Sequence, residues 1–483
     1  MKTRGAAAVV LWCLGCGGGE QAKQEGPPQE QQQQEQPDPE SLRPAFGELW
    51  GSRPATDENP DPMVVEVDLV AELTVHEFRP GKQTDVIAFN GLVPGPTIRA
   101  RVGDTLIIHF TNNLDEPTTI HWHGLRIDDA MDGTPMMQDP VEPGASFTYQ
   151  FTLPDAGSFW YHPHYNTPQQ IERGLMGSII VQEAVPPEFD RERIIFTDDI
   201  RLRTDNQIAR FNTEGMDIMH GRSGNELLIN GKTEQEPVSV RAGTRERWRI
   251  FNGSNARTMS LSLEGAYFRV IGTDGGLLPE PYDTDRLVVA VGQRYDLDVT
   301  FDDVPGASAT LFSHVLELDD NDQVIEVPYP QLVFQYTDEE AQPVRQVVLP
   351  TVEMPDMPAL IPPEKTLALS GYNDGQVHFT INGNAYPDEE HWAVVAGTTT
   401  QVKIINELGM EHPFHLHGQF FRILSPSRAA QEPGWKDTVL IGGGAEVTIE
   451  IFWSNPGDWM YHCHIAEHAE AGMMAHVHVD AEP

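Results

Sequence analysis

The sequence predicts an all-β protein built from three consecutive β-sandwich domains. The chain contains 42 glycines and 38 prolines, and between them run short segments of alternating polar and apolar residues rather than long helical patterns. At 483 residues it is too long for one compact core. One sequence pattern also occurs three times, which indicates three copies of the same unit.

The repeated unit opens on an Asn-Gly pair. A second glycine follows twelve to fourteen residues later, and an asparagine follows that glycine after nine more. The three copies are Asn90-Gly91, Gly103 and Asn112; Asn230-Gly231, Gly243 and Asn252; and Asn382-Gly383, Gly397 and Asn406. They place the domains at residues 62–185, 190–340 and 345–483.

The first sixteen residues resemble a bacterial lipoprotein signal peptide. Lys2 and Arg4 precede a short apolar stretch, which is too short to span a bilayer as a mature helix. Cleavage before Cys16 would leave a cysteine that can carry a lipid anchor. Cys13 departs from the usual pattern, and ordinary export is the alternative. Either interpretation predicts an exported protein of the bacterial cell envelope, in the periplasm or on the outer surface.

Residues 17–61 are rich in glutamine, glutamate and proline. A segment with so few large apolar side chains cannot offset the entropy lost on ordering. We expect a disordered tether between the membrane contact and the folded body.

The net charge and the cysteine content limit the possible binding partners and the possible disulfides. The formal net charge of −41 excludes nucleic acid as a natural partner and favours cations. Beyond the signal region the only cysteine is Cys463, so the folded part forms no internal disulfide.

Domains 1 and 3 each carry two His-x-His pairs at equivalent positions of the repeat. The pairs are His121 with His123, His162 with His164, His415 with His417, and His462 with His464. The middle domain has Leu261 and Leu263 at the first pair of positions, so it brings no metal ligand and is interpreted as a spacer.

Residues i and i+2 of a strand point to the same face, so each pair projects two imidazoles in one direction. Eight imidazoles suit copper, zinc, iron or nickel. Cys463 lies between His462 and His464, and its thiol therefore points to the opposite face. His412, in a loop position, His468 and Met473 complete a set of two imidazoles, a thiolate and a thioether, the ligands of a blue-copper centre.

The stretches HWHG, HPH, HPFHLHG and HCHIAEHAEAGMM resemble, in order, the four copper-binding motifs of multicopper oxidases. This resemblance extends from about residue 62 to the C-terminus and implies three cupredoxin-like Greek-key domains with four copper ions. The implied ligands are His412, Cys463, His468 and Met473 for type 1 copper, His121 and His415 for type 2, His123, His162 and His464 for one type 3 copper, and His164, His417 and His462 for the other.

The same resemblance implies an oxidase that takes single electrons from a reductant at the surface edge of His468. Cys463, His462 and His464 would pass them to the cluster, where dioxygen is reduced to water. Asp132 is either an acid that serves this reaction or simply the first residue of an Asp-Gly turn. Ala469 stands where many bacterial relatives carry an acid, which leaves the proton route open.

Three functions compete. Laccase-like oxidation of phenols and aromatic amines is favoured, because no methionine-rich insertion is present. A metallo-oxidase acting on Cu(I), Fe(II) or Mn(II) fits the acidic composition, with Glu411 beside His412 as a candidate cation contact. A non-enzymatic scaffold is the remote alternative, which the complete ligand set opposes.

Several residues near these motifs have ordinary explanations. We interpret Trp160, Tyr161, Trp459 and Tyr461 as sandwich core, Met474 as packing, and the remaining eight histidines as surface or core residues.

The membrane contact gives the first testable prediction. Cys16→Ala removes the only site for the lipid, so the protein should move from membrane pellets to the soluble exported fraction. Fractionation and mass measurement of the mature N-terminus check this, with unchanged activity per molecule as the control. A wild-type protein that is already soluble and carries no acyl chain would contradict the lipoprotein interpretation.

Overall fold

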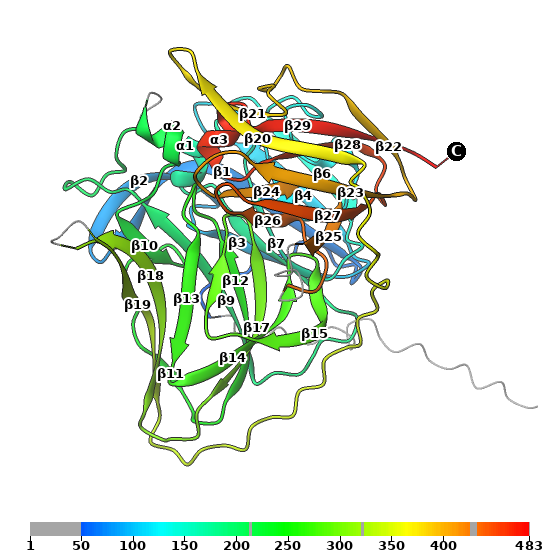
Figure 1. Ribbon diagram of the computed structural model, residues 1–483. Helices are drawn as coiled ribbons and strands as arrows, with labels where there is room; N and C mark the ends of the chain where they lie inside the picture. The colour runs from blue at the N-terminus through cyan, green and yellow to red at the C-terminus, as the bar shows by residue number, and fades with distance from the viewer. Residues whose placement is uncertain (1–49, 212–214, 320–322, 426–431, 483) are drawn as a thin grey trace, which may run out of the picture. The chain divides into compact units, whose positions relative to one another are not determined.

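The computed structural model describes residues 50–211, 215–319, 323–425 and 432–482, and these form three successive β-sandwiches (Figure 1). The signal peptide and most of the tether lie outside the described residues. Each sandwich pairs two sheets, and the predicted all-β, three-domain fold class is confirmed. Among the described helices, none is long and apolar enough to cross a membrane.

The first sandwich packs a sheet of order β2-β1-β4-β6 on one of order β3-β8-β7-β5. Its elements are β1 (Val64–Arg79), β2 (Lys82–Phe89), β3 (Gly95–Arg101), β4 (Thr105–Asn112), β5 (His121–His123), the 3-10 helix η2 (Asp129–Met131), β6 (Ser146–Thr152), β7 (Gly157–His162), α1 (Thr167–Glu172) and β8 (Gly177–Gln182). β4 alternates buried and less buried residues, with Leu106, Ile108 and Phe110 in the core. That period-2 pattern makes this segment a half-buried strand.

The second sandwich has a sheet of order β10-β9-β12-β17-β14-β15 and one of order β11-β19-β18-β13-β16. Its elements are β9 (Arg191–Ile200), α2 (Met216–His220), β10 (Glu226–Ile229), β11 (Val238–Val240), β12 (Arg245–Asn252), β13 (Met259–Glu264), β14 (Ala266–Thr273), β15 (Gly276–Asp283), β16 (Leu287–Val289), β17 (Arg294–Phe301), β18 (Ser308–Leu318) and β19 (Val324–Tyr336).

The third sandwich has sheets of order β21-β20-β23-β27-β25 and β22-β29-β28-β24-β26. Its elements are β20 (Lys365–Asn373), β21 (Val377–Ile381), β22 (Trp392–Val395), β23 (Thr399–Asn406), β24 (His412–Leu416), β25 (Phe420–Ser425), β26 (Thr438–Ile441), β27 (Glu446–Phe452), β28 (Gly457–Cys463), α3 (Ala466–Glu470) and β29 (Met474–Asp480). One helix from each domain, α1, α2 and α3, meets its counterparts at a single place, because α3 contacts both of the others (Figure 1).

The three repeat asparagines make the same hydrogen bonds in each domain. Asn112, Asn252 and Asn406 are buried, and each Nδ2 donates to main-chain carbonyls at both ends of the following loop. The asparagines that open each copy adopt left-handed φ angles of 50° to 56°, which asparagine tolerates better than most residues. The sequence repeat is therefore a repeat of backbone geometry.

The expected tether extends too far. Residues 50–61 lie against the body: the main chain of Ala55 bonds to Thr97, and the Arg193 guanidinium lies 5.6 Å from the ring centroid of Trp50. The aromatic ring of Trp50 supplies an apolar contact to the middle domain.

Buried charges join the first two domains. In the middle domain, Arg247 donates to Glu183 of the first domain and to Asp296. Asp296 also accepts from Ser158 Oγ of the first domain at 2.6 Å. Such a network is costly to bury unless every charge is paired, so it fixes how the two domains meet.

Candidate metal centre

The eight paired histidines come from two antiparallel ladders, one in each terminal domain. In the first domain His121 on β5 lies opposite His162 on β7. In the third domain His415 on β24 lies opposite His462 on β28. The equivalent ladders explain why the motifs align in sequence, and both present their imidazoles at the interface between the two domains.

The imidazoles interleave across that interface. His123 stacks on His415 with ring centroids 3.8 Å apart, and His121 stacks on His417 at 3.9 Å. His123, His162 and His464 form one group whose nitrogens all lie within 4.8 Å of one another. Of the other predicted triad, His417 and His462 approach within 3.1 Å, and the His164 ring lies 5.0 Å from His417 and 5.3 Å from His462. The predicted type 2 pair, His121 and His415, groups with His123.

The nitrogen atoms face the centre in a way that fits metal ions. Main-chain carbonyls accept from Nδ1 of His121, His162, His415 and His462. Nε2 of His121, His162, His164 and His415 is buried without a hydrogen-bond partner. Unpaired buried polar atoms are rare because each costs free energy, and a metal ion would satisfy all of them. His123 is turned round, with Nδ1 facing Nε2 of His464 at 3.2 Å.

Burial also favours the protonation state that binds metal. It lowers the pKa of His462 to about 3 and holds the pKa values of His162, His164 and His464 well below normal. Neighbouring imidazoles add to the effect. The rings are therefore neutral at physiological pH, as ligation requires.

Asp132 contacts the histidine cluster as well as beginning a turn. Its Oδ2 accepts from Nδ1 of His417 at 2.9 Å, and its Oδ1 lies 3.2 Å from Nδ1 of His121. Gly133 behind it has φ of 75°, so the Asp-Gly turn is present as well. Asp132 thus orients a histidine from each terminal domain, His417 through its carboxylate and His121 through its main-chain carbonyl, as outer partners of metal-bound imidazoles do.

A second carboxylate beside the cluster, Asp437, was missed in the sequence. It is fully buried, and its Oδ1 lies 3.3 Å from Nε2 of His123. Burial opposes ionisation, but the Arg294 guanidinium and His123 hold the pKa of Asp437 well below its usual range. Asp437 lies 22 residues after His415 and 314 residues after His123. No motif relates it to either histidine, so sequence spacing could not reveal the contact.

A separate site lies on the other face of β28. His412, Cys463 and His468 form a buried group, with Nδ1 of His412 3.3 Å and Nδ1 of His468 3.7 Å from the sulfur. Met473 is completely buried in the same core, and its carbonyl accepts from the Cys463 amide. Burial raises the pKa of the Cys463 thiol, so a bound cation is needed to stabilise the thiolate there.

The position of His412 corrects one expectation. It begins strand β24 rather than lying in a loop. His415 follows three positions later, and an odd offset in a strand turns two side chains to opposite faces. Strand alternation alone therefore sends His412 to the cysteine site and His415 to the histidine cluster.

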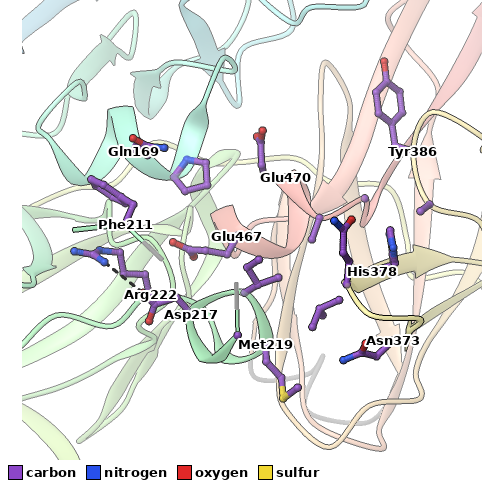
Figure 2. A pocket seen from close by; sticks show the side chains of 18 of the residues that line it. Gln169, Phe211, Asp217, Met219, Arg222, Asn373, His378, Tyr386, Glu467 and Glu470 are labelled. Carbon is purple, nitrogen blue, oxygen red and sulfur yellow. Dashed lines mark hydrogen bonds and ion pairs between the residues drawn. The ribbon is translucent and has the colours of Figure 1, made fainter. Parts of the chain in front are cut away.

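We expected an edge of His468 to lie at the surface, but the structure gives this side chain no exposed area. Phe379 stacks on it at 4.0 Å, and a backbone polar group of Met219 on α2 faces its ring. A cavity of about 800 Å³ lies beyond this cover, where α2 and α3 meet. Figure 2 shows Met219, Glu467, Glu470 and Tyr386 around it.

A second cavity, of about 500 Å³, reaches the histidine cluster. His162, His164, His462 and His464 contribute to its wall, together with Glu116, Ala469 and Glu470. Ala469 brings no acid to this cavity, but Glu116 and Glu470 do.

Most ordinary interpretations of nearby residues agree with the structure. Tyr161, Trp459 and Tyr461 lie in the sandwich cores. Trp160 is also buried, but its ring lies 4.2 Å from that of His162, so it forms part of the cluster wall. Histidines outside the motifs pair with acids, for example His109 with Glu66 and His478 with Asp458.

The middle domain is more than a spacer. None of its described residues belongs to the histidine groups, yet Arg294 bonds Asp437 and α2 covers His468. Three sandwiches, of which the outer two share a buried histidine cluster beside a cysteine–histidine site, define a copper-dependent oxidoreductase.

Comparison with known proteins agrees with this class. Family models described as multicopper oxidase match residues 72–185, 202–323 and 358–483. Multicopper oxidase MmcO of Mycobacterium tuberculosis is 30% identical over 81% of this chain and 83% of its own length. Multicopper oxidase mco of Staphylococcus epidermidis is 29% identical over 83% and 86%.

Solved structures are similar over most of the chain. A multicopper oxidase from Pseudomonas thermotolerans has a TM-score of 0.74 at 30% identity, covering 86% of this chain and 99% of that one. One from Campylobacter jejuni, described as a metallo-oxidase, has a TM-score of 0.74 at 27% identity, covering 92% and 97%. The chain belongs to the multicopper oxidase family, whose members oxidise reducing substrates with dioxygen as acceptor.

The predicted role of Met473 as a thioether ligand of type 1 copper can be tested by its effect on redox potential. A thioether is a weak donor that stabilises oxidised copper relative to no ligand. Met473→Leu should therefore raise the type 1 potential and keep the blue colour, with ~60 mV corresponding to about 1.4 kcal/mol on a one-electron couple. Redox titration followed in the visible band measures the shift.

Met474 is the matched control. It lies opposite His462 in the ladder between β28 and β29, so it faces the other site. Met474→Leu should leave the type 1 potential nearly unchanged. A shift in that variant and none in Met473→Leu would contradict the prediction and indicate Met474 as the thioether ligand.

Proposed function

We propose that this protein couples four one-electron oxidations of a reductant to the four-electron reduction of dioxygen to water. The single observation that carries the proposal is the place of Cys463. Its sulfur belongs to the site beside His412 and His468, while the residues on either side, His462 and His464, belong to the histidine cluster. Two redox sites are thus joined through one residue of backbone.

The proposal includes four copper ions. His412, Cys463, His468 and Met473 would hold type 1 copper, and His121 and His415 type 2 copper. The type 3 pair would be held by His123, His162 and His464 and by His164, His417 and His462. Copper bound there supplies reversible one-electron chemistry, while the chain fixes the positions, dryness and hydrogen bonding of the donors.

Reduction of one dioxygen to two waters also consumes four protons. The position of Asp132 supports a role for its carboxylate in that transfer, because the carboxylate accepts from His417 and lies 3.2 Å from Nδ1 of His121. The cavity beside His462 and His464 would admit dioxygen and water, and Glu116 lies in its wall.

We favour a small aromatic reductant, a phenol or an aromatic amine. The cavity over α3 has the volume of a small-molecule site, and Phe211, Met219 and Tyr386 in its wall offer apolar and aromatic contacts. The reductant would meet Met219 and its neighbours rather than His468 itself, because His468 is covered.

A metallo-oxidase is the second candidate. Asp217, Glu467 and Glu470 give the same cavity an acidic wall (Figure 2). Its one arginine, Arg222, already pairs with Asp217 and Glu172. Oxygen ligands of this kind attract Fe(II) or Mn(II), and the similar Campylobacter jejuni protein is described as a metallo-oxidase. A scaffold without activity is opposed by the complete donor sets.

The place of action remains a proposal from the sequence. We propose export to the bacterial cell envelope with a lipid on Cys16, which would hold the catalytic body near the membrane.

Cys463→Ser tests the proposed electron route. Replacing the thiolate should abolish the blue band and oxidase turnover while copper remains at the histidine cluster, because only the donor of the first site is lost. Copper analysis, visible spectra and oxygen uptake check this. In the wild type, oxygen uptake without released hydrogen peroxide is expected; release of peroxide as the product would contradict four-electron reduction.

Glu470→Gln separates the two substrate classes. If the cavity receives a metal cation, loss of this charge should lower kcat/KM for Fe(II) by about tenfold, or ~1.4 kcal/mol. If it receives a neutral phenol, kcat/KM for the phenol should change less than about threefold. Steady-state assays with both substrates decide, and Glu446→Gln, an acid outside this cavity, is the control.

A further inference from the structure

The turn between β16 and β17 brings the middle domain directly against the histidine cluster. Gly292 in this turn has φ of 84°. A Cβ there would lie 2.8 Å from Cδ2 of His464 and 3.1 Å from Cε1 of His123. Only a residue without a side chain allows the main chain this close to the two rings.

The next residue but one, Arg294, begins β17 and has no exposed area. Its Nη1 and Nη2 donate to the two oxygens of Asp437 at 2.8 and 2.5 Å. Its Nε donates to the Ser158 carbonyl, and its guanidinium also donates to the carbonyls of Gly292 and Asp274. One side chain therefore contacts all three domains.

Asp437, held in place by Arg294, in turn bonds to two histidines of the cluster. Its carboxylate accepts from Nε2 of His123, which leaves Nδ1 of His123 facing His464. Its main-chain carbonyl accepts from Nδ1 of His415 at 2.9 Å, which leaves Nε2 of His415 free. The partner of one imidazole nitrogen decides which nitrogen can bind metal.

We propose that Arg294 is a positioning residue of the histidine cluster: through Asp437 it fixes the rings of His123 and His415, so the ligand-free middle domain shapes the copper site. Lysine could supply the charge but not the fork that holds both oxygens. This inference rests on the copper assignment proposed above.

A purely structural role is the competing explanation, and the chain offers a matched control. Arg193 is equally buried, lies in the same sheet and makes a forked pair with Glu246. Its pair belongs to the middle domain and includes no member of the cluster. Both arginines should cost stability when replaced, but only Arg294 should affect the cluster.

The experiment compares the full-length, copper-loaded wild type with Arg294→Lys and Arg193→Lys. Arg294→Lys should keep the blue type 1 band, shift the type 2 electron paramagnetic resonance signal and weaken the near-ultraviolet type 3 band. Copper affinity of the cluster should fall about 10- to 100-fold, as for other outer partners of metal-bound histidine. Arg193→Lys should keep all three signals of the wild type.

Asp437→Asn serves as the second variant if Arg294→Lys does not fold. It is close in shape, loses the charged half of the pair and should reproduce the same spectral change. Wild-type type 2 and type 3 signals in either variant, or equal changes in Arg193→Lys, would overturn the positioning role. Absence of those signals from the wild-type enzyme would instead overturn the proposed copper assignment.

Discussion

The structure depends on the sharing of eight imidazoles between the first and third domains. Each domain contributes two antiparallel strands whose paired histidines, such as His121 opposite His162, point out of its own core. Docking of the two halves buries ring nitrogens, such as Nε2 of His121 and of His415, that no protein group satisfies. The two halves complete each other only when stacked as His123 is on His415. Metal ions bound there would satisfy these nitrogens, so metal binding would also stabilise the docking of the two domains.

The middle domain helps to hold the two terminal domains in the positions in which their histidines interleave. Ser158 of the first domain donates to Asp296 and accepts from Arg249, which is itself paired with Asp296. The first domain is therefore held against the second by a buried network of paired charges. Arg294 then connects the second domain to Asp437 of the third. Paired buried charges tolerate little displacement, because any gap leaves a charge without a partner. They hold the terminal domains at the separation that the interleaved rings need.

The sequence predicts what depends on local periodicity. Strand alternation placed His462 and His464 on one face of β28 and Cys463 on the other, and the three repeats predicted three sandwiches. The sequence alone could not predict contacts between segments that are far apart in the chain. Asp437 reaches His123 across 314 positions, and Arg294 reaches Asp437 across 143. The cover over His468 depends on how α2 packs on α3, which no spacing in the sequence encodes.

The cavity beyond His468 and the strand that carries Cys463 are built from largely separate parts of the fold. The cavity proposed for the reductant is built largely from α2, α3 and the segments around Asn373 and Tyr386, so its wall can change without disturbing the strands that carry the paired histidines. The connection from Cys463 to the cluster is different, because it is the covalent chain of β28 itself. A shift of one residue in that strand would turn Cys463 toward the cluster and both histidines away from it. Ladder register, fixed by pairs such as Phe414 with Cys463, thus sets the coupling between the two metal sites.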